Sequence, residues 1–537
     1  MNTLSDRYHR LRWWGLAAIS LGVALIIMDS TIVSVAIPSI IEDLSLTTTQ
    51  VQWVQEVYTL VFAALLMVWG VTSDRLGRRR LLIIGLILFV GSSVLCAFAP
   101  TGGWLIAARA LQGVGGSMIL PTTLALLNAT FRGPERAIAF AVWGSTIGGM
   151  AAVGPVLGGW LTSSFSWEWA FWINLPFGLL VIAGLLFAVQ ESRQADARHF
   201  TDWVGALLSV LGFGSLVFGL IEGRAYGWWT ATDDAPVTFG SISIIPVLFV
   251  AAAVLLTLLV VWENRRVKAG KTVLLDVTLF RIKSFANGNV TALTVSLGEF
   301  GIILSLPLWF QYVRDMDALH AGLSLLPLAI GSFLASGSVH SMSKHLSPIQ
   351  MVRLGLTMEI LGLMALAILL RPDSSGWVTG VPLLVYGMGV GFATAQLTQV
   401  ILSDVPVEES GQASSTQSTS RQVGSALGIA ILGTALFTTL RAGTESRLSE
   451  EIAANPQVGE LVKGVSDSAG ALIAELSANP ATAAIAQAAR EGLTQGVSVA
   501  AFVGVSVLVV GFLTTIPLAR QQKAAAAERA ANAETTE

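Results

Sequence analysis

Charge and cysteine are scarce in this 537-residue sequence. Only 12% of the residues are Asp, Glu, Lys or Arg, whereas an ordinary soluble chain has about 25%. The single cysteine, Cys96, excludes an internal disulfide and a cysteine metal site. With a net charge of −3 and no separate basic domain, nothing indicates a nucleic-acid partner. The composition therefore favours a protein that lies mostly within a membrane.

Long hydrophobic runs are abundant instead. Hydrophobic residues make up 53% of the chain. Fourteen segments are long enough to span about 30 Å of hydrocarbon at about 20 residues each. The first, residues 13–38, is too long for a signal-peptide core and lacks a cleavage site. These runs predict an all-α polytopic membrane protein with 14 transmembrane helices. Their centres lie near Leu25, Ala63, Phe89, Ser117, Met150, Leu179, Leu211, Val250, Val295, Leu328, Leu361, Gly389, Gly428 and Val507.

Positive charges predict the orientation. If the N-terminus is inside, the inner segments hold 21 lysines and arginines and the short outer loops hold three. Because translocated positive charges are disfavoured in short loops, both termini are expected in the cytoplasm. The connection over residues 441–491 is long enough to cross regardless of charge.

An even helix count indicates two six-helix halves with an inserted pair. Residues 337–344 follow the tenth segment as residues 70–78 follow the second, which is a weak internal repeat. The expected domains are an N-terminal half (1–193), an inserted pair with a basic link (194–284), a C-terminal half (285–518) and a cytoplasmic tail (519–537).

Two extramembrane parts remain. The Ala-rich segment over residues 441–491, broken by Pro456 and Pro480, is expected to form either a short helical hairpin or a flexible linker. The Ala/Glu-rich tail over residues 521–537 is expected to be disordered.

No nucleotide or cofactor site is expected. Gly270-Lys271-Thr272 resembles the end of a phosphate loop, but Arg265 stands where that loop needs glycine. The glycine-rich run over residues 387–391 lies inside an apolar segment with no strand before it, unlike a dinucleotide site. If this membrane protein performs work, its energy would therefore come from an ion gradient and not from a nucleotide.

The link between the second and third segments is short, charged and glycine-bearing. Residues 70–80 read GVTSDRLGRRR. A positive-inside anchor would explain the arginines but not the acid and the glycines. This stretch is similar to the loop signature of the major facilitator superfamily. That resemblance implies a conformational loop made by Gly70, Asp74, Arg75, Gly77 and Arg78.

Four further stretches strengthen the resemblance. Residues 29–38 (DSTIVSVAIP) resemble the first-helix signature of the 14-helix drug:proton antiporter branch, and residues 109–116 (RALQGVGG) the superfamily motif with a buried arginine. Residues 154–159 (GPVLGG) resemble the antiporter motif, and residues 167–176 (WEWAFWINLP) match the entry to the sixth helix. The antiporter motif places Gly154, Pro155, Gly158 and Gly159 at a tight helix contact.

Charges inside membrane segments are candidate functional groups because they are costly there. We expect Asp29 and Glu299, on repeat-related helices, to face each other across a central cavity. Glu56 near the outer end of the second helix is a third candidate. Arg109 needs an anion or carbonyls at its depth, and Arg421 is its second-half analogue. The proton-coupling or substrate-binding set is thus Asp29, Glu56, Arg109, Glu299 and Arg421.

Structural roles stay open for the same residues. Asp29 could be a structural partner of Arg109, Glu56 an interfacial anchor, and Glu299 the partner of a polar neighbour. For Arg421, function and packing are equally compatible with the sequence. Among other acids, Glu359 is expected to serve packing, and Glu222 and Glu263 are expected to be solvated at helix ends.

The sequence thus predicts a proton-coupled antiporter that exports small cationic or amphipathic compounds by alternating access. Export of one metabolite, such as a polyamine, amino acid or lipid, is an alternative; an importer, facilitator or non-transporting sensor fits less well. We expect a monomeric, multi-pass protein of a bacterial plasma or inner membrane that is not an enzyme. Its partners would be a small-molecule substrate, protons and the bilayer, without cofactor, metal or nucleotide.

Overall fold

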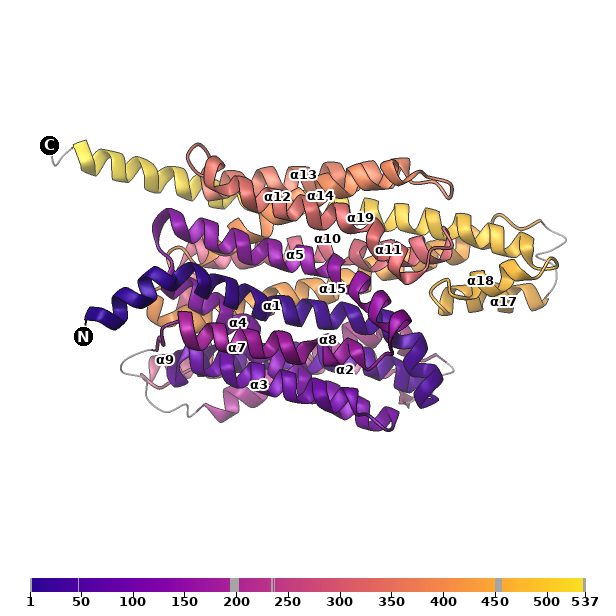
Figure 1. The fold of residues 1–537 in the computed structure, drawn as a ribbon, viewed down its shortest axis with the longest axis horizontal. Coiled ribbons are helices and arrows are strands. Elements are labelled where there is room, and N and C mark those ends of the chain that lie inside the picture. Colours follow the sequence, from indigo (N-terminus) through magenta and orange to yellow (C-terminus); the bar gives the residue numbers. More distant parts are fainter. Residues whose placement is uncertain are drawn as a thin grey trace.

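Long helices build almost all of the molecule (Figure 1). The computed structural model describes residues 2–46, 48–193, 202–232, 235, 237–449 and 456–534. The helices are α1 (Asn2–Leu44), α2 (Thr48–Leu76), α3 (Arg78–Ala97), α4 (Gly102–Thr130), α5 (Gly133–Ser164), α6 (Trp169–Trp172), α7 (Asn174–Ala188), α8 (Trp203–Tyr226), α9 (Ile244–Lys268), α10 (Lys283–Tyr312), α11 (Ala318–Ser324), α12 (Leu326–Met342), α13 (Pro348–Leu369), α14 (Gly376–Ile401), α15 (Ser410–Glu445), α17 (Pro456–Asp467), α18 (Leu472–Ala478) and α19 (Ala483–Glu534). Two 3-10 helices, η1 (Val277–Arg281) and η2 (Val407–Glu409), and the antiparallel strands β1 (Thr238–Phe239) and β2 (Ile242–Ser243) complete the described elements.

Local sequence signals set several helix starts. Asp202 caps α8, where its carboxylate accepts a 2.9 Å hydrogen bond from the Gly205 N–H. Ser347 and Gln350 form a capping box on α13, whose first residue is Pro348. The first N–H groups of a helix have no partner within the helix. A short polar side chain just before each of these apolar runs accepts their hydrogen bonds, which fixes where the helix begins.

The predicted count of 14 membrane spans is not confirmed by the described residues. Among the described residues, 12 helices are long and apolar enough to cross a membrane, or up to 13 if the bent α5 is one span. Helix α5 bends by 42° between Met150 and Val153. Helix α10, at the ninth predicted segment, is 30 residues long and packs against α15 and α19. The all-α membrane architecture is confirmed, whereas the count of 14 is not.

The helices pack side by side into one bundle. Helices α1 to α7 contact mainly one another, and α10 to α19 do the same. Contacts between these two groups run through α5 against α11, α12 and α14, and through α15 against α2 and α4. Helix α8 packs on α9, α2 and α15, so the α8–α9 pair touches both groups. The predicted domain boundaries remain a prediction.

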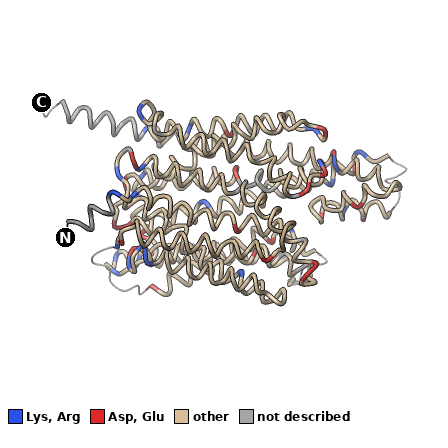
Figure 2. Tube along the Cα trace, in the orientation of Figure 1, with Lys and Arg blue, Asp and Glu red and all other residues tan. Residues whose placement is uncertain are grey.

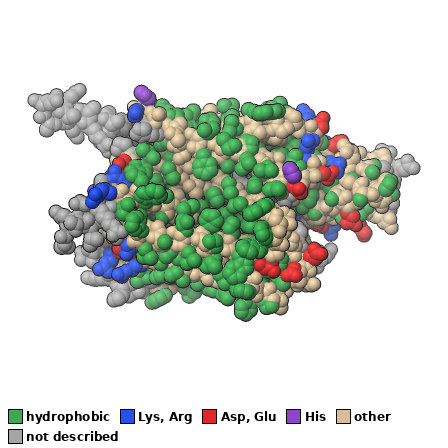
Figure 3. All heavy atoms as spheres, viewed as in Figure 1, with side chains coloured by type: hydrophobic (Ala, Val, Ile, Leu, Met, Phe, Trp, Pro, Cys, Tyr) green, Lys and Arg blue, Asp and Glu red, His purple; other side chains and the backbone are tan. Residues whose placement is uncertain are grey.

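The outer surface of the bundle is apolar around its middle. Hydrophobic side chains cover the central part of the visible face, and charged groups gather toward the two ends (Figure 3). The start of α1 and the end of α19 lie at one end, which we call the terminal end (Figure 1). Many Lys and Arg residues also lie there (Figure 2). Exposed residues such as Leu179, Val250 and Phe333 contribute to this apolar surface. Such a band matches the hydrocarbon of a bilayer.

Two extramembrane predictions have different outcomes. At the end opposite the terminal end, α17 and α18 pack against α15 and α19, burying Val462 and Ile473. The helical alternative is therefore confirmed for the described part of residues 441–491. The tail was expected to be disordered, but α19 continues as far as Glu534. Its Ala-rich sequence has high helix propensity, which explains the difference.

Candidate functional site

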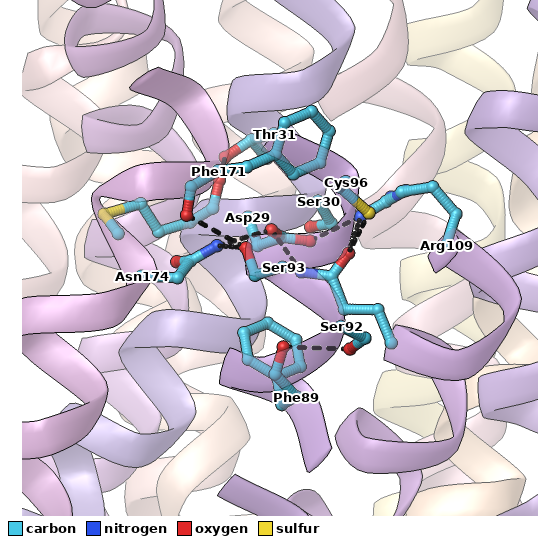
Figure 4. Close-up of polar contacts among 12 residues, drawn as sticks. Asp29, Ser30, Thr31, Phe89, Ser92, Ser93, Cys96, Arg109, Phe171 and Asn174 are labelled. Atoms are coloured by element: carbon cyan, nitrogen blue, oxygen red, sulfur yellow. Dashed lines mark hydrogen bonds and ion pairs between the residues drawn. The ribbon is translucent and has the colours of Figure 1, made fainter. Parts of the chain in front are cut away.

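Asp29 lies at the centre of a buried polar network in the first helix group (Figure 4). Its Oδ2 accepts a 2.6 Å hydrogen bond from Arg109 Nη1, which also makes the pair a salt bridge. Its Oδ1 accepts hydrogen bonds from Gln112 Nε2 at 2.7 Å and from Asn174 Nδ2 at 2.8 Å. Three donors from α4 and α7 thus hold one carboxylate of α1, whose side chain is 0% exposed.

Arg109 is held from several sides. Nη1 also donates to Gln112 Oε1 at 2.7 Å, and Nε donates to the carbonyl of Val54 on α2 at 3.3 Å. The guanidinium carbon lies 4.4 Å from the centre of the Tyr58 ring, a cation–π distance. The buried guanidinium therefore has a carboxylate, an amide, a carbonyl and an aromatic face as partners. These partners offset the free-energy cost of burying a charge inside the membrane.

Sequence analysis did not select Gln112 and Asn174 as site residues. Both lie inside the recognised motifs of α4 and α7, but amides carry no charge that would mark them as costly in a membrane. The spacing offered one signal: Gln112 follows Arg109 by three residues and so shares its helix face. Asn174 also donates to Ser93 Oγ at 2.9 Å, which ties α3 to the network.

A second, looser pair lies in the other helix group. Arg421 Nη2 is 3.5 Å from Glu299 Oε2, and Thr394 Oγ1 donates to Glu299 Oε1 at 3.2 Å. The Glu299 backbone carbonyl accepts a 3.4 Å hydrogen bond from the Tyr386 hydroxyl. The carboxyl of Glu299 thus comes from α10, while its partners come from α14 and α15.

Asp29 and Glu299 belong to separate buried ion pairs. Each is paired with an arginine of its own helix group, and both are buried. The expectation that they face each other across a cavity stays a prediction. The geometry agrees with the alternative that Asp29 is the partner of Arg109. The guanidinium of Arg109, on the neighbouring helix α4, neutralises the Asp29 carboxylate at close range.

Glu56 has an unexpected neighbour. The carboxyl of Glu222 on α8 lies near it, and Glu222 is buried rather than solvated. Glu263 is buried as well, and its Oε2 accepts a 3.2 Å hydrogen bond from the Leu274 N–H. The expectation that Glu222 and Glu263 are solvated was therefore wrong. Sequence position places a residue at a helix end, but packing of α8 and α9 on the bundle decides its exposure.

The loop over residues 70–80 connects the two helix groups. Asp74 is buried and accepts hydrogen bonds from Arg78 Nη2 at 2.6 Å, from the Gly411 N–H at 2.9 Å and from the Gln412 N–H at 3.0 Å. Arg78 Nη2 also donates to the Val407 carbonyl at 2.7 Å. The carboxylate of α2 thus sits on the first turn of α15, where free N–H groups favour an anion.

The other loop residues make room for this contact. A side chain at Gly70 would overlap Ser415 of α15. Gly77 has φ of 109°, a left-handed conformation that glycine adopts freely, and it starts α3. Arg75 is half-buried on the last turn of α2. The two glycines therefore allow the close approach and the tight turn that their positions suggested.

The glycine motif of α5 contacts both helix groups. A side chain at Gly154 would overlap Thr31, and a Cβ at Gly158 would lie 3.1 Å from the Ile32 carbonyl of α1. A Cβ at Gly159 would lie 3.1 Å from the Leu319 nitrogen of α11 in the other group. Pro155 lies inside the helix, just beyond the bend. Small residues thus permit close packing here.

The terminal end has further contacts between the groups. Asn128 Nδ2 donates to Ser410 Oγ at 2.6 Å, and Arg136 Nη2 donates to the Leu402 carbonyl at 2.5 Å. Together with the Asp74 contacts, these bonds link the two helix groups at that end. The α5–α11 contact links them near the opposite end as well.

Comparisons with known proteins agree with this architecture. The family model described as Major Facilitator Superfamily matches residues 19–429. Multidrug resistance protein Stp of Mycobacterium tuberculosis is 33% identical over 455 residues, covering 84% of this chain and 81% of the relative. Multidrug efflux pump LfrA of Mycolicibacterium smegmatis is 34% identical, with 79% of this chain and 81% of the relative covered.

The fold also resembles a solved transporter structure. The human organic anion transporter MFSD10 (TETRAN) superposes with a TM-score of 0.59 over 93% of this chain and 98% of that chain, at 13% identity. That likeness concerns the fold alone, whereas the family match and the bacterial relatives extend over most of the sequence. The chain belongs to the Major Facilitator Superfamily.

Proposed function

We propose that this protein exports small cationic or amphipathic compounds from the cell in exchange for protons. The observation that carries the proposal is the pair of buried carboxylate–arginine contacts, Asp29 with Arg109 and Glu299 with Arg421. Ionisable groups placed inside membrane helices are costly and mark ion or substrate pathways. The names of the relatives, multidrug resistance protein and multidrug efflux pump, support drugs and similar compounds as the substrate class.

Proton exchange is possible because the carboxyl of each carboxylate–arginine pair can bind or release a proton. When a proton binds the carboxyl, its charge is removed and the arginine loses its counter-ion. The arginine then needs another anion or a rearrangement of the helices, so protonation and conformation are linked. A cationic substrate that neutralises the carboxylate would compete with the proton for the same charge. One buried site could thus serve both sides of an exchange.

The proposal places both termini in the cytoplasm of a bacterial cell, with the protein acting as a monomer and without catalytic activity. The excess of Lys and Arg at the terminal end supports this orientation (Figure 2). The Asp74 contacts would then lie on the cytoplasmic side, where they hold the bundle closed until the two helix groups rock apart.

Transport in everted membrane vesicles tests the proposal. Everted vesicles that contain the protein should accumulate a fluorescent cationic dye when a proton gradient, acidic inside, is imposed, and a protonophore should abolish that accumulation. The control is the same vesicle preparation with the Asp29→Asn variant. Dye uptake that does not depend on the gradient would contradict proton exchange and favour a facilitator.

A second candidate is the export of one dedicated compound. Relatives named probable actinorhodin transporter, from Streptomyces coelicolor, and tetracenomycin C resistance and export protein, from Streptomyces glaucescens, favour it. A resistance screen in an efflux-deficient host separates the candidates, because a multidrug exporter should protect against several unrelated cations and a dedicated exporter against one compound.

A further inference from the structure

Glu359, in the middle of α13, is a buried acid that belongs to neither of the two carboxylate–arginine pairs. Its side chain is 0% exposed, and neither carboxyl oxygen has a hydrogen-bond partner in the part of the chain that the structure describes. Glu299, by contrast, has Arg421 and Thr394 as partners. A carboxylate without a partner in so apolar a place would be very unfavourable, and a neutral carboxyl that carries its proton avoids this cost.

Helix α14 is shaped to admit this side chain. A Cβ at Gly389 would lie 2.6 Å from Glu359 Cγ, so the acid packs where glycine leaves space. One turn to each side, Gly355 and Gly362 of α13 also lie close to the α14 backbone. A Cβ at Gly355 would lie 2.6 Å from the Ala393 nitrogen, and a Cβ at Gly362 would lie 2.7 Å from the Pro382 carbonyl. The glycine-rich run over residues 387–391, which fits no nucleotide site, thus includes the position beside this acid.

Glu359 and its surroundings together hold one positive charge and two carboxyls. Tyr386 of α14 packs beside Gly362, one turn from Glu359, and donates to the Glu299 carbonyl at 3.4 Å. The charges of Glu299 and of its partner Arg421 act on Glu359. One arginine balances one carboxylate, so the set is neutral only when the other carboxyl keeps its proton. If Glu359 lost that proton, a cation would have to enter or Arg421 would have to leave Glu299.

Arg421 can leave Glu299 more easily than Arg109 can leave Asp29. Arg421 lies 3.5 Å from Glu299, whereas Arg109 lies 2.6 Å from Asp29, which also has two amide donors. A polar chain also leads away from Glu299 toward the terminal end. Thr398 Oγ1 donates to the Thr394 carbonyl at 2.9 Å and accepts from Gln417 Nε2 at 3.1 Å.

We propose that Glu359 carries the exchangeable proton of the second helix group, and that Glu299 and Arg421 form with it a site where a substrate cation replaces that proton. The proposal deepens the proposed antiport and rests on it. In this conformation the proton stays on Glu359 while Arg421 pairs with Glu299. Entry of a cation beside the two carboxyls releases the proton, and departure of the cation restores it, so charge is balanced in both states.

Carbodiimide labelling tests the resident proton without any transport. In dicyclohexylcarbodiimide, the proton of a neutral carboxyl goes to a nitrogen and the carboxyl oxygen bonds to the central carbon. The adduct rearranges to a stable N-acylurea, with no group lost. Peptide mass spectrometry of the membrane-embedded protein should find the label on Glu359 and not on the arginine-paired Asp29. A cationic substrate should reduce the labelling at least severalfold.

Matched variants test the coupling role. Glu359→Gln should remain folded, because a neutral side chain replaces a neutral one, but should lose at least tenfold in gradient-driven export while it still binds the dye. Glu359→Asp should recover part of the export, which a packing role would not predict. Glu475→Gln, at an exposed position of α18, is the control and should match the wild type.

Two results would overturn the proposal: no label on Glu359 in folded protein, or normal gradient-driven export by Glu359→Gln. A labelled Glu359 in wild-type protein that exchanges dye without any proton dependence would instead refute the proposed antiport. In that case the coupling role falls with the antiport and only the resident proton is supported, so the two failures can be told apart.

Discussion

At the scale of single residues, the Asp29 network explains why a carboxylate and an arginine can be stable inside a membrane bundle. Their charges cancel at 2.6 Å, and Gln112 and Asn174 satisfy the remaining carboxylate oxygen. The sequence predicted the two charged members from their cost in an apolar segment. It offered their pairing only as an alternative, because pairing depends on how α1 packs beside α4, and it gave no reason to select neutral amides.

Asp29→Asn should abolish gradient-driven export and also destabilise the protein. The substitution leaves Arg109 buried without its counter-ion, which costs about 3–5 kcal/mol for a buried pair. Thermal unfolding in detergent and dye efflux measure the two effects. The double variant Asp29→Asn with Arg109→Gln should recover stability but not export. Normal export by a well-expressed Asp29→Asn protein would contradict this role.

At the scale of elements, the contact between α2 and α15 joins the two helix groups. The sequence indicated that α2 ends in a functional loop but not which helix that loop contacts. The motif over residues 70–80 indicated a conformational loop, but the partner of Asp74 lies more than 300 residues away, at Gly411 and Gln412. A contact of that range follows from the fold and not from local pattern. Likewise, hydropathy located most spans, but it could not reveal the 42° bend of α5.

Asp74→Asn should lower the maximal transport rate about tenfold, equivalent to about 1.4 kcal/mol, with little change in KM. The amide is neutral, so it loses the charge-assisted bonds to Arg78 and to the first turn of α15, which are about twice as strong as neutral ones. Arg80→Gln is the control, because Arg80 is 67% exposed and lies 3.9 Å from its acid partner, Glu191. Initial rates of dye transport at several concentrations measure both parameters. A raised KM with an unchanged maximal rate would place Asp74 in substrate binding instead.

At the scale of the whole molecule, the two helix groups contact each other near both ends. Near the terminal end, Asn128 bonds to Ser410 and Asp74 to the start of α15. Near the opposite end, Gly159 of α5 meets Leu319 of α11. Neither Asp29 nor Glu299 is exposed in this state. Exchange across the membrane therefore requires that one set of contacts opens while the other holds.

Cross-linking can test whether the terminal end must open. In a Cys96→Ser background, cysteines at positions 128 and 410 joined by a short, reducible bifunctional thiol reagent should reduce dye export to background, because the two helix groups could no longer separate there. Reduction of the link should restore export. The control joins positions 291 and 514 of α10 and α19, whose threonine hydroxyls are 3.0 Å apart within one group. That link should leave at least half of the transport rate, since it spans no moving boundary. Undiminished export by the protein linked between 128 and 410 would show that transport does not need this end to open, and the rocking mechanism would have to be abandoned.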